Sequence, residues 1–224
     1  MTQFNFETSV IWESIPVLMG GAKLTIYITL VGLFFGFILG ALAGIGKISR
    51  NQFLNRVTTI YVEAIRGTPL MVQVMFLYFG LPLALGMRVP PLTAGIVAIA
   101  VNSGAYISEI VRGAVQSINV GQAEAARSIG LTNFQSMLYV IWPQAFKRMI
   151  PPLGNQFIIS LKDTSLLVVI GVGELTRQGQ EIIAVNFRSF EVWMAVALIY
   201  LTMTLSIAKL LHMLEKRMNI STNS

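Results

Sequence analysis

A few charged and polar side chains inside long apolar stretches are the residues through which this sequence could perform chemistry. Lys162 and Asp163 interrupt the apolar segment 149–172, and Asp163 is the only aspartate in the chain. A charge near the middle of a bilayer costs about 2.5–3.5 kcal/mol on insertion scales, so at least one of the pair should face a cavity or a polar neighbour. We interpret the pair, with the adjacent Thr164, as part of a substrate or gating site. A structural ion pair with another helix is the alternative.

Two further groups of residues could contribute to such a site. Asn102 and Ser103 lie at a similar depth in the apolar segment 89–108. They could line a polar site together with the Asp163 segment, or simply bond across helices, a contact worth about 0.6 kcal/mol on average. Arg66 and Thr68 belong to the sequence Arg-Gly-Thr-Pro, whose guanidinium and loose backbone could bind an anionic group. Arg66 could equally be an anchor at the cytoplasmic edge of the membrane.

The residue types that the sequence lacks exclude several other kinds of site. There is no cysteine, so disulfides, thiol catalysis and cysteine-ligated metals are excluded, and the single histidine, His212, cannot form a cluster. There is no Gly-x4-Gly-Lys-Ser/Thr phosphate-binding loop, because Gly46 and Lys47 are followed by Ile48. We therefore expect no enzyme active site, metal or cofactor in this chain. If ATP drives the protein, another chain must bind the nucleotide.

The composition indicates an integral membrane protein. Hydrophobic residues make up 54% of the chain and charged residues 12%, and the mean hydropathy is +0.70; a soluble domain carries about 25% charge. Five apolar segments approach or exceed the length that crosses a hydrocarbon core of about 30 Å. They predict an all-α protein with five transmembrane helices, at residues 24–45, 67–87, 89–108, 149–172 and 192–208.

We expect one transmembrane domain at 21–218, preceded by a separate N-terminal segment and followed by a short tail at 219–224. Residues 1–20 mix aromatic and aliphatic side chains with Glu7 and Glu13, which predicts an interfacial amphipathic helix. A disordered tail is the alternative for this segment.

Glycine and proline constrain the geometry of the first two spans. Pro69 cannot donate a backbone N–H, so the second span should be irregular near residues 66–69, and Pro82 should bend it again. Glycines recur every four residues along one face of the first span, where a neighbouring backbone could approach closely. These glycines are Gly32, Gly36, Gly40 and Gly44.

Basic residues distribute unevenly between the loops. If residues 47–56, residues 112–148 and the C-terminus share one side, that side holds ten Lys and Arg residues, and the other side holds four. The positive-inside rule makes the richer side cytoplasmic, which places the N-terminus outside. The net charge of +6 is explained by this distribution, and we expect membrane lipid and no nucleic acid as a partner.

The polar stretch Gly121–Pro143 separates two strongly apolar regions. Its small residues favour a short helix that Gly130 ends, and Thr132 or Asn133 can cap a second helix that starts near Phe134. Such a helix at the edge of a membrane protein is a shape that another protein could bind. A connector without a partner fits the local pattern equally well.

The same stretch resembles the signature E-A-A-x3-G-x9-I-x-L-P of permease subunits of bacterial ATP-binding-cassette importers. Glu124, Ala125 and Ala126 are followed at the expected spacing by Gly130 and by Val140-Ile141-Trp142-Pro143, with Val and Trp at the I-x-L positions. In that family the loop docks into the ATPase subunit. The resemblance therefore implies a cytoplasmic coupling loop at 119–145, with ATPase-coupling roles for Gly121, Glu124, Ala125, Ala126 and Gly130.

Further motifs resemble permeases for polar amino acids, with the glutamine permeases most similar and the histidine, arginine and cystine permeases sharing most of the pattern. The resemblance implies the type I importer permease fold in the bacterial inner membrane, with a periplasmic N-terminus and a cytoplasmic C-terminus. It also implies a second permease subunit, two ATPase subunits that hold ATP and Mg, and a periplasmic amino-acid-binding protein. The motifs are residues 66–70, 102–110, 151–157, 162–166 and 174–184.

The resemblance implies a permease subunit that imports a polar amino acid, with glutamine as the substrate, by alternating access. The candidate substrate-binding residues are Arg66, Thr68, Asn102, Ser103, Lys162, Asp163 and Thr164. An ATP-independent secondary transporter is the main alternative. Such folds usually contain internal inverted repeats, but the sequence shows no repeat and five spans do not divide into equal halves.

Overall fold

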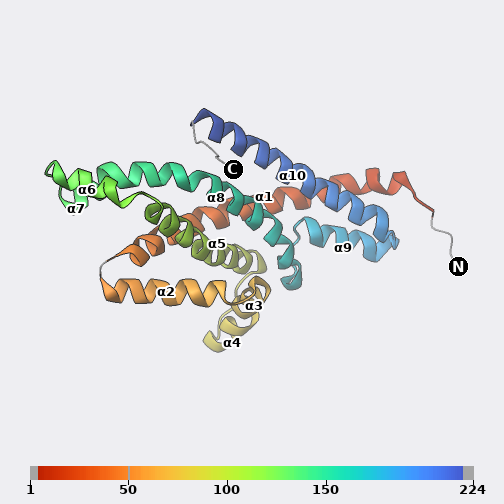
Figure 1. Cartoon of the computed structure of the whole chain (residues 1–224). Coiled ribbons are helices and arrows are strands. Elements are labelled where there is room, and N and C mark those ends of the chain that lie inside the picture. The colour runs from red at the N-terminus through yellow and green to blue at the C-terminus, as the bar shows by residue number, and fades with distance from the viewer. Residues whose placement is uncertain (1–4, 50, 219–224) are drawn as a thin grey trace.

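The structure of the protein is a computed structural model that describes residues 5–49 and 51–218. All regular secondary structure in these ranges is helical, which confirms the predicted all-α class (Figure 1). The α-helices are α1 (Thr8–Ile48), α2 (Gln52–Arg66), α3 (Leu70–Met75), α4 (Leu81–Leu85), α5 (Pro91–Gln116), α6 (Val120–Ser128), α7 (Asn133–Ser136), α8 (Trp142–Asp163), α9 (Leu175–Asn186) and α10 (Ser189–Arg217). They are supplemented by π-helical turns at Phe76–Gly80 and Met137–Ile141 and a 3₁₀ segment at Thr164–Ile170.

Four helical stretches of the described chain are long and apolar enough to cross a membrane, and one bent pair makes a fifth. The bent pair joins Gln52–Arg66 to Leu70–Leu85 at an angle of 103°. The bend includes Pro69, which confirms the predicted irregularity. The other four stretches are Thr8–Ile48, Pro91–Gln116, Asn133–Ile170 and Ser189–Arg217.

Several helices extend beyond the predicted spans. The predicted second span, 67–87, leaves out α2, which forms the first half of the bent pair. Helix α5 continues past the predicted end at Ser108, so that Glu109 and Arg112 lie inside the helix rather than at its exit. The stretch between the predicted fourth and fifth spans contains a further helix, α9. The sequence did not predict these extensions, because a charged residue ends an apolar segment without ending the helix.

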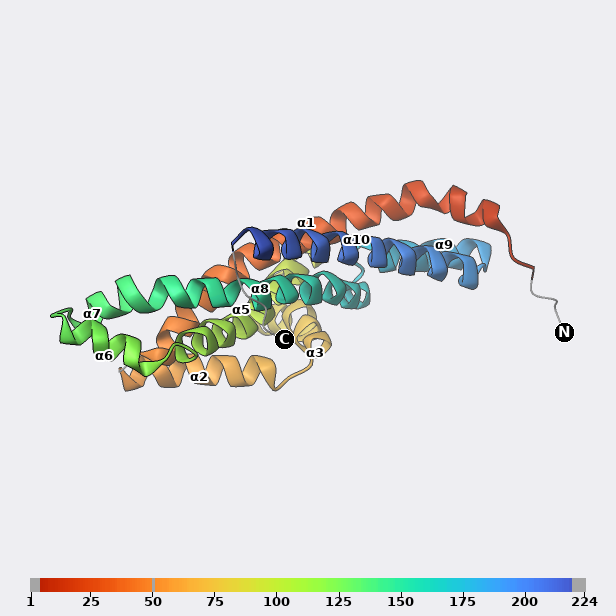
Figure 2. The same cartoon turned by 45° about the horizontal axis from the view of Figure 1, so that its top comes forward.

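Helix α1 joins the predicted N-terminal segment to the first predicted span. It runs without a break from Thr8 to Ile48, so no boundary separates residues 8–20 from the first span, and residues 1–4 lie outside the described chain (Figure 2). The reason is packing: Leu18 and Ala22 belong to one buried apolar cluster with residues of α9 and α10. The N-terminal part of α1 therefore has its own partners within the fold.

Helices α1 and α5 pack closely through the predicted glycine stripe. A Cβ atom on Gly40 would lie 2.6 Å from Cβ of Ile107 and 2.7 Å from the backbone oxygen of Gly104, so a larger residue has no space. The partners on α5 recur every four residues, as the glycines do, and the two rows therefore run along each other. The pairs are Gly32 with Ile99, Gly36 with Ser103, Gly40 with Ile107, and Gly44 with Val111.

Helix α9 is fixed to α10 by a buried carboxylate. Glu174 precedes α9 and accepts hydrogen bonds from the backbone N–H groups of Thr176, at 3.0 Å, and Arg177, at 2.9 Å. The hydroxyl of Tyr200 on α10 donates to the same carboxylate at 2.9 Å. Burial raises the pKa of Glu174 above its ordinary value, and these donors counteract the rise. Glu174 is thus an N-cap that also joins two helices.

Replacement of Gly40 by valine should destabilise the protein, because the new side chain meets the α5 backbone, which cannot rotate away. We expect a cost of at least about 1–3 kcal/mol, the usual range for overpacking. Fluorescence-detected size-exclusion chromatography after heating would measure the loss in detergent. Gly20→Val is the matched control, since a Cβ at Gly20 meets nothing within 4 Å. Equal melting temperatures for the two variants would contradict the assigned packing.

Candidate functional site

A polar cavity of about 550 Å³ opens where the second span is broken. Its walls come from three places: the bend between α2 and α3, one face of α5, and the C-terminal half of α8. The break matters for the chemistry because irregular backbone within a membrane span is tolerated only where it is buried in protein or lines a cavity. The lining residues are Arg66, Gly67, Thr68, Pro69, Leu70, Asn102, Tyr106, Gln156, Ile159 and Asp163.

The bend is held by the side-chain amide of Gln73, which is buried on α3. Its Nε2 donates to the backbone oxygens of Ile65, at 2.7 Å, and Thr68, at 3.0 Å, which the interrupted helix leaves without their usual partners. Its Oε1 accepts a hydrogen bond from Nδ2 of Asn102 at 3.1 Å. The amide therefore provides hydrogen bonds to the backbone oxygens at the break and attaches the bend to α5.

The structure brings four of the seven predicted substrate-binding residues to the cavity: Arg66, Thr68, Asn102 and Asp163. The other three do not line it. Ser103 is buried against the glycine stripe of α1, Lys162 is exposed, and the hydroxyl of Thr164 donates to the backbone oxygen of Leu161 at 2.7 Å. Neighbouring residues on an α-helix point about 100° apart, so Ser103 and Lys162 face away from the cavity that their neighbours line.

Two polar cavity residues, Tyr106 and Gln156, were absent from the predicted set. Tyr106 follows Asn102 by four residues on α5, and Gln156 precedes Asp163 by seven residues on α8. Both intervals place two residues on the same face of a helix. Helical spacing from the chosen residues would have found both. Gln156 is buried, and its Nε2 donates to Oγ of Ser160 at 3.2 Å.

The cavity combines one cation, one anion and side-chain amides. The Arg66 guanidinium lies 5.3 Å from the centre of the Tyr106 ring, a cation–π distance. The Asp163 carboxylate is half-buried, and among residues 5–49 and 51–218 it has no ion-pair partner within 4.0 Å. The amides of Asn102 on α5 and Gln156 on α8 line the same cavity. Such a set can bind a zwitterion that carries a polar side chain.

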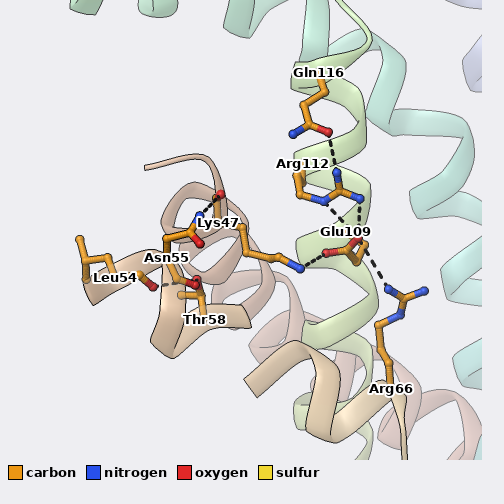
Figure 3. A network of polar contacts seen from close by, with 8 residues as sticks. All are labelled: Lys47, Leu54, Asn55, Thr58, Arg66, Glu109, Arg112 and Gln116. Atoms are coloured by element: carbon orange, nitrogen blue, oxygen red, sulfur yellow. Dashed lines mark hydrogen bonds and ion pairs between the residues drawn. The ribbon is translucent and has the colours of Figure 1, made fainter. Parts of the chain in front are cut away.

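A charged cluster beside the cavity links the C-terminal ends of α1 and α2 to α5 (Figure 3). Its centre is the carboxylate of Glu109 on α5. Oε1 accepts from Nζ of Lys47 at 2.6 Å, and Oε2 accepts from Nη2 and Nε of Arg112 at 2.7 and 3.1 Å. Nη1 of Arg66 lies 3.6 Å from the same Oε2. Arg66 thus belongs to both the cluster and the cavity wall.

The predicted coupling stretch forms a protruding pair of short helices at one end of the molecule, α6 and α7 (Figure 1). Gly130 ends α6 with a φ of +93°, a backbone conformation that glycine adopts at no steric cost, which confirms the predicted stop. Thr132 caps α7 in a reciprocal arrangement with Gln135, which confirms the predicted cap. The second helix is short, because it continues through a π-helical turn into α8.

The surface of this protrusion suits a protein partner. Of the five predicted coupling residues, Gly121, Glu124, Ala125 and Gly130 are exposed, and Ala126 is buried. Large apolar side chains stand exposed among them, with exposed fractions of 70% or more. These are Val120, Ile129 and Phe134.

The described residues contain no group of three or more His, Cys, Asp or Glu side chains that could hold a metal ion.

A broken membrane span that lines a polar cavity, together with an exposed helical protrusion, is typical of the membrane-spanning subunits of transport systems. Residues 13–220 match the family model described as the binding-protein-dependent transport system inner membrane component. The chain belongs to this family. It is therefore a multi-pass inner membrane protein, in agreement with the predicted location.

Similar proteins from two bacteria cover nearly the whole chain. The glutamine transport system permease protein GlnP of Escherichia coli is 54% identical over 216 residues, which span 96% of this chain and 99% of the relative. The L-cystine transport system permease protein TcyB of Bacillus subtilis is 37% identical and covers 95% of this chain and 93% of the relative. Both similarities agree with the predicted family of amino-acid permeases.

A solved structure shares the fold. A chain of an amino acid ABC transporter, crystallised with histidines, superposes with a TM-score of 0.91 at 40% identity and covers 96% of this chain and 100% of its own length. The predicted importer permease fold is confirmed at this level. The direction in which the chain crosses the membrane stays a prediction.

Replacement of Gln73 by alanine should destabilise the bent span. The change removes the donors to the oxygens of Ile65 and Thr68 and leaves Asn102 without its acceptor, and each buried unsatisfied group costs about 1–3 kcal/mol. Thermal stability in detergent would measure the loss. Gln122→Ala, on the exposed face of α6, is the control and should leave the melting temperature unchanged. A Gln73→Ala variant as stable as the control would contradict the assigned role of the amide.

Proposed function

We propose that this chain is the permease subunit of an ATP-driven importer that moves a polar amino acid, glutamine, from the periplasm to the cytoplasm. The observation that carries the proposal is the cavity at the broken span, which brings a guanidinium, a carboxylate and side-chain amides together from three helices. A chain 54% identical to a glutamine permease over nearly its full length supports glutamine as the substrate.

Each group of the amino acid has a suitable partner in the cavity. Arg66 would bind the α-carboxylate, since a guanidinium can offer two parallel N–H donors to a carboxylate. Asp163 would bind the α-ammonium. Gln156 and the free Oδ1 of Asn102 would bind the side-chain amide, because Nδ2 of Asn102 already donates to Gln73. Thr68 also lines the cavity, and its hydroxyl would act by supporting the bend, because it donates to the backbone oxygen of Ala64 at 3.0 Å and accepts from Nε2 of Gln73 at 3.0 Å.

The energy for transport would come from partner chains. Two ATPase subunits, which hold ATP and Mg, would bind the α6–α7 protrusion on the cytoplasmic side, and Gly121, Glu124, Ala125 and Gly130 would contact them. Ala126 is buried, so it would contribute indirectly by packing α6 against the rest of the protein. A periplasmic binding protein would deliver the amino acid. A second permease subunit, either another copy or a related chain, would complete the pathway by alternating access.

The orientation follows from the basic residues. The cytoplasmic side would hold the α1–α2 connection, the protrusion and the C-terminal end of α10. The N-terminus would lie on the periplasmic side. The protrusion and the start of α2 lie at the same end of the molecule, away from the start of α1, which supports this arrangement (Figures 1 and 2).

A cationic amino acid is the second candidate substrate. Asp163 has no ion-pair partner among the described residues, so its carboxylate could bind a guanidinium or imidazolium side chain instead of the α-ammonium. The similarity to an amino acid transporter crystallised with histidines supports this alternative. Binding of glutamine, arginine, histidine and cystine to the permease–ATPase complex, compared without the binding protein, would distinguish them.

Replacement of Asp163 or Asn102 by alanine should reduce amino-acid-stimulated ATPase activity in proteoliposomes by about tenfold or more, the factor that corresponds to about 1.4 kcal/mol of lost binding. Lys162→Ala is the matched control, because Lys162 neighbours Asp163 in the chain but does not line the cavity. Retention of full stimulation in both cavity variants would contradict the proposed site. An ATP-independent mechanism would instead show transport that an uncoupler stops and vanadate leaves unchanged.

Replacement of Gly130 by aspartate should prevent co-purification of the ATPase while the permease remains folded. An aspartate at φ +93° adds backbone strain of about 1–2 kcal/mol and a charge beside the exposed apolar residues. Glu124→Lys should have the same effect by reversing a charge on the protrusion. Gln122→Ala on the same helix is the control. An ATPase that still co-purifies with both charge variants would argue against this docking surface.

A further inference from the structure

One oxygen atom of Glu109 is shared between two arginines. Oε2 accepts from Nη2 of Arg112 at 2.7 Å and from its Nε at 3.1 Å, and Nη1 of Arg66 lies 3.6 Å away. Lys47 occupies the other oxygen at 2.6 Å. In Figure 3 these three basic side chains converge on Glu109 from α1, α2 and α5. Arg66 is the most weakly held of the three, because its contact is the longest.

Arg66 is also the member of this cluster that lines the cavity. Its side chain is 44% exposed, against 13% for Lys47 and 33% for Arg112, and it lies over the ring of Tyr106. It stands at the end of α2, directly before the bend. The guanidinium therefore has two possible partners, the Glu109 carboxylate on one side and an anionic group in the cavity on the other.

The charge balance of the cluster makes these two partners compete. Three cations surround one carboxylate, so the four side chains carry a net charge of +2, from three positive charges and one negative charge. A negative Glu109 attracts Arg66 and weakens the positive potential at the cavity wall. Arg112 has the opposite effect, because it occupies the oxygen that Arg66 would otherwise approach.

We propose that Glu109 is a positioning residue that sets the affinity of the cavity for the carboxylate group of the amino acid by competing for Arg66. Arg112 keeps Arg66 available to the cavity by holding Oε2. This inference rests on the proposed function, since it requires an amino acid in the cavity. It adds a residue outside the cavity to those that determine how tightly the substrate is held and released.

The inference predicts opposite effects for two substitutions in one cluster. Glu109→Gln should tighten glutamine binding, because Arg66 loses its competing partner, and Arg112→Gln should weaken it, because Oε2 is freed to draw Arg66 away. Each change should be about twofold to fivefold in Kd, the range of a partly exposed ion pair. Loss of a merely structural contact would weaken binding in both variants.

Isothermal titration of glutamine into the permease–ATPase complex in nanodiscs, without the binding protein, would measure these changes. Arg66→Gln should weaken binding, and in its presence Glu109→Gln should have no further effect. Arg56→Gln is the matched control, since it removes the same charge from an exposed position on α2 that does not line this cavity. It should leave Kd unchanged.

Arg112→Gln keeps the Lys47–Glu109 ion pair, so it carries the test if Glu109→Gln does not assemble. Shifts of Kd in the same direction for both variants would overturn the inference, and so would an effect of Glu109→Gln that persists without Arg66. A wild-type complex that binds no glutamine or other polar amino acid would overturn the proposed function as well. Amino-acid binding by the wild type with unchanged affinities in the variants would overturn only the role of Glu109.

Discussion

One side-chain amide stabilises the break in the second span. Hydrocarbon offers no water to an unpaired carbonyl, so a helix that is interrupted within a membrane must find its hydrogen bonds inside the protein. Gln73 supplies two of these bonds at the bend and accepts a third from Asn102 on α5. The shape of the cavity wall, the position of Arg66 in that wall and the approach of α3 to α5 all depend on this arrangement.

Local features of the fold could be predicted because short-range rules govern them. The bend at Pro69 follows from a missing donor, and the end of α6 at Gly130 follows from the conformational freedom of glycine. The continuity of α1 through residue 20 could not be predicted in this way. It depends on the burial of Leu18 against α9 and α10, which are far away in the sequence. Tertiary contacts can keep polar residues inside a helix. A prediction based only on the length of an apolar segment places the end of the helix at such residues.

The candidate site was predictable in its residue types and less so in its geometry. Intramembrane polarity selected Asn102 and Asp163, which line the cavity, but it could not separate them from neighbours that face elsewhere. Ser103 faces the glycine stripe of α1, although it is adjacent to Asn102. The sequence could not predict the Glu109 cluster, because its members come from three separate helices and only the fold brings them together.

The regular spacing of the glycine stripe has a mechanical consequence. Four close contacts at equal intervals fix the register of α1 on α5, because a slide of one residue would place side chains where only glycine fits. The nearest alternative register lies four residues away, about 6 Å along the axis. Helices α1 and α5 should therefore move as one rigid unit. Because α6 follows α5 after a short connection, a force applied at the protrusion would displace α1 and α5 together, and the bend at Pro69, which Gln73 attaches to α5, would move with them.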